Sequence, residues 1–234
     1  MKVIEQWPPH PPHPSGPPEW RPPVAPDPVA PQPLRLPVVT PETFDADLTS
    51  RLLRRRIVLV TGRIDETAAA SVVATLLLLD EDDHRPIRLH LSTDDADLEP
   101  AALVADTIDL LASPVHAVAL GTVGGAALGV LAAAQSRTAH PQSLFVLRDP
   151  QRNVALGIGD VDADRAARIA DQQQRLLTRL HQRIAHAAGR PVEQVTADLR
   201  AGRVLTAAEA VAYGLVQGLA DGAGQQSSGT DGLH

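Results

Sequence analysis

The feature that most limits what this chain can fold into is a repeated alternation of short β-branched segments with longer helical ones. We expect strands at residues 57–60, 87–91, 115–120 and 144–147. We expect helices at residues 66–79, 100–112, 125–134, 162–188 and 192–199, and a further helix opened by Thr206 and Glu209, which have capping-box spacing. Strands that alternate with helices in this way predict an α/β fold with a mainly parallel sheet.

The helix expected at 162–188 is longer than a simple doubly wound fold requires. Its apolar residues recur at helical spacing and are Ile169, Leu176, Leu177, Leu180 and Ile184. A segment this long is not easily covered by one small domain, and exposed apolar stripes usually mark an interface. We therefore expect an arm whose apolar side contacts another subunit.

Prolines divide the chain into domain and flanks. Fifteen of the 21 prolines lie within residues 8–41. Proline removes backbone donors, and this stretch carries too little apolar surface to fold. We predict a disordered segment at 1–41, a folded domain at 42–220 and a disordered, glycine-rich tail at 221–234. The first segment is expected to be a spacer, with a ligand for a proline-recognising module as the alternative.

Composition excludes several kinds of chemistry. The chain has no cysteine, and Lys2 is its only lysine. These facts exclude a cysteine nucleophile and thiolate metal sites, and they remove a Ser–Lys dyad and a Schiff base from the folded domain. A formal net charge of −7 and the scarcity of aromatic residues argue against a nucleic-acid partner. No apolar run reaches the ~18 residues of a membrane span, and the first residues do not resemble a secretion signal, so we expect a cytoplasmic protein.

Four segments resemble the proteolytic subunit of the ATP-dependent Clp protease. They are 50–58 (SRLLRRRIV), 62–65 (GRID), 141–143 (PQS) and 205–215 (LTAAEAVAYGL). The resemblance runs in order from about residue 44 to 220, with a small insertion near 151–160. It implies a crotonase-like superhelix of β-α-β units, assembly as two stacked seven-membered rings, and docking of ATP-driven unfoldases. The helix at 162–188 would be the family's handle, which joins one ring to the other.

The resemblance also places a serine–histidine–aspartate triad, and two of its three residues are replaced. The serine position is Gly125, the histidine position is Arg148, and only Asp198 keeps its identity. The oxyanion-equivalent positions are Ala96 and Ala126. Glycine cannot form an acyl-enzyme, and a guanidinium that is always protonated cannot act as a base.

The loop that would stabilise an oxyanion is altered in the same direction. It reads Thr93-Asp94-Asp95-Ala96, and two carboxylates there would oppose the developing negative charge. Coordinated losses predict a non-catalytic homologue that assembles with copies of itself or with active Clp subunits, and that an unfoldase could still engage. We expect no cofactor and no metal.

Two alternatives stay open at this point. An active serine endopeptidase would need a displaced nucleophile at Thr122, Ser136 or Ser143, with His140 as base; such residues are usually ordinary loop or cap residues. A crotonase-type acyl-CoA enzyme would use the backbone near Gly124 and Gly125, but no glutamate pair accompanies it.

The remaining charged groups have ordinary explanations. Arg148 is expected to pair with Asp198 in a salt bridge. The acidic clusters at 80–83 and 94–99 are expected to be solvated loops. His181 and His186, five apart on the long helix, are poorly spaced for a shared metal.

Overall fold

The computed structural model describes residues 41–150 and 163–220, so the predicted disordered segments and the predicted insertion lie outside the described residues. The strands are β1 (Ile57–Thr61), β2 (Ile87–Ser92), β3 (Val115–Ala119), β4 (Thr122–Gly124), β5 (Ser136–Ala139), β6 (Leu144–Leu147), β7 (Arg203–Thr206) and β8 (Gly218–Leu219). The helices are α1 (Pro41–Arg54), α2 (Glu66–Asp82), α3 (Leu98–Leu110), α4 (Ala127–Ala133), α5 (Ala163–Ala188), α6 (Val192–Ala201) and α7 (Ala207–Tyr213).

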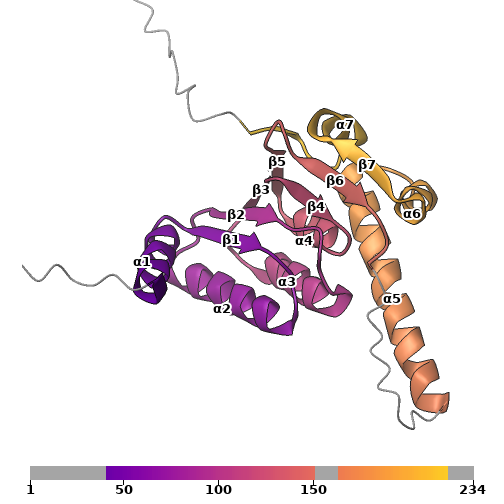
Figure 1. Cartoon of the computed structure of the whole chain (residues 1–234), viewed down its shortest axis with the longest axis horizontal. Helices are drawn as coiled ribbons and strands as arrows, with labels where there is room; N and C mark the ends of the chain where they lie inside the picture. The colour runs from indigo at the N-terminus through magenta and orange to yellow at the C-terminus, as the bar shows by residue number, and fades with distance from the viewer. Residues whose placement is uncertain (1–40, 151–162, 221–234) are drawn as a thin grey trace, which may run out of the picture. The chain divides into compact units, whose positions relative to one another are not determined.

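Two sheets organise these elements. The larger sheet has the order β1-β2-β3-β5-β8, and all its neighbouring strands are parallel. The smaller sheet has the order β4-β6-β7, with β4 parallel and β7 antiparallel to β6. Figure 1 shows α2 and α3 along the same side of β1 and β2. The predicted α/β fold with a mainly parallel sheet is confirmed.

The core follows from the alternation of side chains along the strands. In β2 the residues Ile87, Leu89 and Leu91 are fully buried, whereas Arg88 between them is exposed. Helix α2 begins at the N-cap Asp65, whose carboxylate accepts from the backbone N–H of Ala68. The capping box predicted at Thr206 and Glu209 is present at the start of α7.

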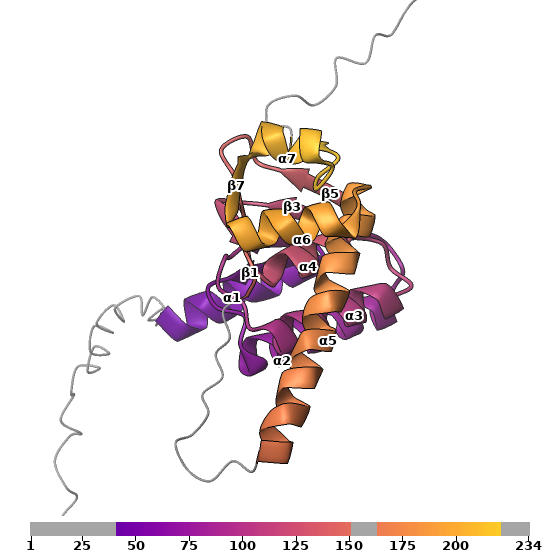
Figure 2. The same cartoon turned by 90° about the vertical axis from the view of Figure 1, so that its right-hand side faces the viewer.

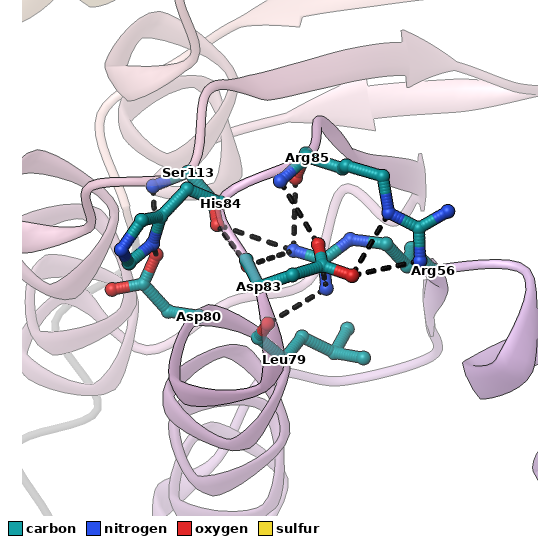
Figure 3. A network of polar contacts seen from close by, with 7 residues as sticks. All are labelled: Arg56, Leu79, Asp80, Asp83, His84, Arg85 and Ser113. Atoms are coloured by element: carbon teal, nitrogen blue, oxygen red, sulfur yellow. Dashed lines mark hydrogen bonds and ion pairs between the residues drawn. The ribbon is translucent and has the colours of Figure 1, made fainter.

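A buried arginine joins the ends of several elements (Figure 3). Arg56 follows α1 with a left-handed backbone (φ 56°) and is 6% exposed. Its guanidinium donates to the carbonyl oxygens of Leu79 and Arg85, at 2.7 and 2.8 Å, and lies 3.0 Å from the carboxylate of Asp83. These contacts attach the start of β1 to the end of α2.

The acidic cluster at 80–83 is therefore not simply solvated, and that part of the sequence interpretation was wrong. The Asp80 carboxylate accepts from the backbone N–H groups of Ala112 and Ser113, and the contacts with Ser113 lower the pKa of Asp80. Asp83 accepts from Arg85, which lowers the pKa of Asp83 as well. Both carboxylates act as acceptors for neighbouring loops (Figure 3).

Helix α5 is the long helix that the sequence predicted. Its first half extends past α2 and α3 in both views (Figures 1 and 2), and from residue 164 to 175 every side chain is exposed or only partly buried. Burial begins at Leu176. Among residues 41–150 and 163–220, no helix combines the length and apolar character that crossing a membrane requires.

The apolar stripe of α5 needs a correction. Leu176 and Leu180 are each 7% exposed and Ile184 is fully buried, all three within the core of this chain. The stripe was expected to face another subunit, but its second half packs against the chain's own body. Only Ile169 and Leu177 keep partly exposed surface for a partner.

Candidate functional site

A sharp turn joins strand β4 to helix α4 at Gly125. The glycine has a left-handed backbone (φ 56°), and its N–H donates to the carbonyl oxygen of Val146 at 3.2 Å. A left-handed residue between a strand and a helix is the geometry that presents the nucleophile in α/β-hydrolases. The backbone therefore has the shape of a nucleophile turn, although Gly125 has no side chain.

Gly124 fixes the position of this turn between two neighbours. A Cβ atom on Gly124 would come within 2.9 Å of Val146 in β6 and within 3.2 Å of the Asp94 side chain. The Gly124 N–H donates to the carbonyl oxygen of Thr93 at 3.1 Å. A residue with a side chain would push these segments apart. The close approach places the 93–97 loop, the turn and the end of β6 together.

Arg148 lies beside the empty nucleophile position. A Cβ atom on Gly125 would be 3.9 Å from Nε of Arg148, in ordinary van der Waals contact. The Arg148 guanidinium donates to the backbone carbonyl of Asp94 at 2.7 Å and lies 3.6 Å from its carboxylate. The structure thus brings the sequence-derived positions 125 and 148 together, with a guanidinium where the resemblance places a base.

Asp198 belongs to a different group of contacts. Its carboxylate accepts from the hydroxyl of Tyr213 at 2.8 Å and lies 3.5 Å from the guanidinium of Arg203. The predicted Arg148–Asp198 salt bridge was therefore wrong, because Arg148 pairs with Asp94 instead. Burial, together with the hydrogen bond to Asp198, raises the pKa of Tyr213 to about 12.

Tyr213 is also stacked on a cation, since the guanidinium of Arg190 lies 4.2 Å from its ring centroid. Asp198 thereby holds the last helix against α6. These contacts give Asp198 a structural role.

The 93–97 loop is held from its other side by residues 63 and 64. The Ile64 N–H donates to the carbonyl oxygen of Asp95, and the Asp97 N–H donates to that of Ile64, which makes a bridge opposite Ala96. The carboxylate of Asp95 points to Arg63 at 3.8 Å. Ala126, the other predicted oxyanion position, is buried. The two loop carboxylates diverge, and only Asp94 contacts Arg148 beside the turn.

Ser143 and His140 were considered above as a displaced nucleophile and a displaced base. Ser143 is fully buried, and its hydroxyl donates to the carbonyl oxygen of Ala119 at 3.0 Å. His140 is an exposed residue whose Nδ1 accepts from the backbone of Gln142. Beside the turn, a recess lies between α3, α4 and α5. Its lining is mostly apolar, with Leu98, Ala101, Ala126, Gly129, Leu176 and Leu180, and includes the charged residues Asp106, Arg179 and Arg183.

Sequence reasoning did not predict the burial and the partners of Arg137 and His181. Arg137 in β5 donates to the carbonyl oxygens of Ala134, Ala187 and Leu215, each at 2.9 Å. His181 in α5 lies between the side chains of Asp149 and Thr196. Neither has a partner at a recognisable spacing, so no sequence signal could have identified these contacts.

Comparison with known proteins identifies the family. The sequence model of the Clp protease family matches residues 42–222. The chain belongs to the Clp protease family. An ATP-dependent Clp protease proteolytic subunit of Leuconostoc citreum is 28% identical over 185 residues, which cover 77% of this chain and 90% of that protein. A Clp protease proteolytic subunit-related protein 2, chloroplastic, of Arabidopsis thaliana is 32% identical over 173 residues, which cover 73% of this chain and 60% of that protein.

A solved Clp structure shares the fold. A point mutant of ClpP1 from Listeria monocytogenes aligns with a TM-score of 0.64 and 26% identity, covering 75% of this chain and 97% of that one. This likeness confirms the Clp-type, crotonase-like fold expected from the sequence. Because the sequence resemblance assigns this segment to the family's long helix, we use the name handle for residues 163–188 of α5.

Proposed function

We propose that this chain is a non-catalytic homologue of the Clp protease proteolytic subunit, which assembles into Clp-type rings or modulates them. The observation that carries the proposal is the pair at the nucleophile turn. Gly125 has no hydroxyl, and the group beside it is the guanidinium of Arg148, held by the carbonyl of Asp94. Neither nucleophile nor base is available there.

The third triad position supports the same conclusion. An orienting aspartate acts by accepting from the base. Asp198 instead accepts from Tyr213 and pairs with Arg203. Restoring peptide hydrolysis at this turn would therefore require a nucleophile, a base and a rearranged Asp198.

Assembly is the function left to the chain, and the handle is the surface we assign to it. The first half of α5 is mostly exposed, and a groove runs between it and α3. The groove carries both signs of charge together with apolar surface, from Glu99, Leu103, Asp106, Arg168, Arg175 and Arg179. The partner would be a second copy or an active Clp subunit, with a Clp ATPase as a further partner.

Residues 42–220 would form the assembling unit, in the cytoplasm, without a cofactor or a metal. The flanking segments would be dispensable. A protein of residues 42–220 should then keep the melting temperature and the native mass of the full chain.

Two measurements test the proposal together. Purified full-length chain is incubated with a fluorophosphonate probe and with fluorogenic peptides, beside an active Clp subunit as positive control. We expect no labelling and no turnover. Native mass spectrometry of the chain, alone and mixed with the active subunit, should show homomeric or mixed rings. Turnover that the probe abolishes would instead support an active endopeptidase, and a monomer in both samples would refute the assembly role.

A further inference from the structure

A chain of three polar side chains lies where the handle joins the body. Nε2 of His181 lies 2.8 Å from the carboxylate of Asp149, and its Nδ1 lies 3.1 Å from the hydroxyl of Thr196. Asp149 follows β6, His181 is in α5 and Thr196 is in α6. His181 is only 8% exposed, so both ring nitrogens are satisfied at a buried junction of three elements.

The partners define the direction of these hydrogen bonds. A carboxylate can only accept, so Nε2 carries the hydrogen that points to Asp149. The hydroxyl of Thr196 can donate or accept, so it is a compatible partner for Nδ1. Every member of the chain has a compatible partner, which is the condition under which a buried polar group does not destabilise the fold.

The neighbouring charged groups are engaged elsewhere. Arg148, next to Asp149, donates to Asp94, and Asp198, two residues after Thr196, accepts from Tyr213. Helix α4, which packs on α5 nearby, contributes only apolar residues and glycine. The three side chains therefore form a connection of their own. It is separate from the contacts of positions 148 and 198, although Asp149 and Thr196 lie close to these positions in sequence.

We propose that His181 is a positioning residue that fixes the orientation of the handle on the body, both its tilt and its rotation about its own axis. The apolar contacts of Leu176, Leu180 and Ile184 hold α5 on the body, but hydrophobic contact is non-directional. The two hydrogen bonds of His181 have preferred angles and reach opposite elements. Together with the hydrogen bonds of Arg183 to Asp106 and Asp109 in α3, at 2.8 and 2.6 Å, they determine which side of the free half of α5 faces a partner.

The geometry makes the free half sensitive to this junction. Ile169 lies twelve residues before His181, which is about 18 Å along an α-helix. A tilt of roughly 10° at the junction would displace Ile169 by about 3 Å over that length, enough to separate atoms in contact. The inference rests on the proposed function only for the role of the handle in assembly; the orientation itself can be measured in a single chain.

The absence of cysteine allows that measurement on the full chain. Cysteines introduced at the exposed positions Ala167 in α5 and Leu110 in α3 carry spin labels, and pulsed electron resonance measures the distance between them. Labelled chain is diluted with unlabelled chain, so that only distances within one chain are recorded. The His181→Leu and Thr196→Val variants are compared with His186→Gln, which changes an exposed histidine on the same helix.

We expect one narrow distance distribution for the parent and for His186→Gln. His181→Leu and Thr196→Val should broaden or shift it, and should weaken association in native mass spectrometry by about tenfold while circular dichroism stays unchanged. Thr196→Val nearly conserves volume, so it remains informative if His181→Leu does not fold.

Two results would overturn the inference. One is an unchanged distance distribution in a folded His181→Leu or Thr196→Val variant. The other is fluorophosphonate labelling of Thr196 that His181→Leu abolishes, because the three side chains would then be a catalytic relay. A parent that is monomeric with a narrow distribution would refute the assembly role alone and leave the positioning role of His181 intact.

Discussion

Gly129 in α4 and Leu180 in α5 are in such close contact that a Cβ atom on the glycine would come within 2.6 Å of Cδ1 of Leu180. Gly129→Ala should therefore force the buried leucine to move and lower the free energy of unfolding by about 1–2 kcal/mol. Urea denaturation followed by circular dichroism measures this change.

The same contact predicts a reversal of sign in a second background. Leu180→Ala removes the obstructing methyl group, and Gly129→Ala should then be neutral or stabilising by up to about 1 kcal/mol, because alanine favours the helix. An equal loss of stability in both backgrounds would show that the contact does not determine the effect.

Arg56 should be far more important to stability than the arginine before it. Arg56→Ala leaves the carbonyls of Leu79 and Arg85 without their donor and Asp83 without its close cation, and should cost about 3 kcal/mol. Arg55→Ala is the matched control at an exposed neighbouring position and should change stability by less than about 0.5 kcal/mol. Equal effects in thermal or urea unfolding would contradict the assigned network.

The only tyrosine of the chain gives a direct titration. The pKa of Tyr213 is raised from 10.0 to about 12 in the folded state, so folding favours the protonated phenol. Its stabilising contribution is complete below pH 10 and is lost as the pH rises towards 12. Phenolate absorbance should show a midpoint near 12 for folded chain, and Asp198→Asn should lower that midpoint. A folded-state midpoint near 10 would refute the buried contact.

The handle should contain one position that affects assembly and another that affects folding. Ile169→Asp changes a partly exposed residue of the free half and should reduce the native mass while circular dichroism is unchanged. Leu180→Asp places a charge in the core and should abolish cooperative folding. Full-size assemblies of Ile169→Asp would exclude this part of the handle from the interface.

A serine at the nucleophile turn should not restore activity by itself. Gly125→Ser places a side chain at a φ of 56°, which costs about 1–2 kcal/mol, and leaves Arg148 in the place of the base. We expect no fluorophosphonate labelling of this variant, and slow labelling only when Arg148→His is added. Rapid labelling of the single variant would show that another base serves the turn.

Sequence periodicity predicted the elements that bury apolar side chains, and it missed those defined by backbone pairing. The buried alternation in β2 was recognisable, whereas β5 (Ser136–Ala139) is a short polar segment that is a strand only because it pairs with β3 and β8. The same limit applied to α5. Its apolar spacing was correct, but spacing cannot show whether Leu180 meets a partner or the chain's own Gly129.

The sequence likewise predicted some features of the candidate site and not others. Motif order along the chain located Gly125 and Arg148, and the structure places them side by side. The order of the motifs could not show the partner of Asp198, because a carboxylate accepts from whichever donor the fold brings near. Arg203 and Tyr213 are both close to Asp198 in sequence, yet nothing in their spacing distinguished them from Arg148 as partners.

The contact between Asp198 and Tyr213 has a consequence for inferring activity from inherited residues. An aspartate that also supports a neighbouring helix is needed for folding whether or not it takes part in chemistry. Its presence therefore says little about turnover, whereas the side chains at positions 125 and 148 support no helix in this way. Residues whose side chains have no structural role are therefore the better indicators of whether a site of this kind is active.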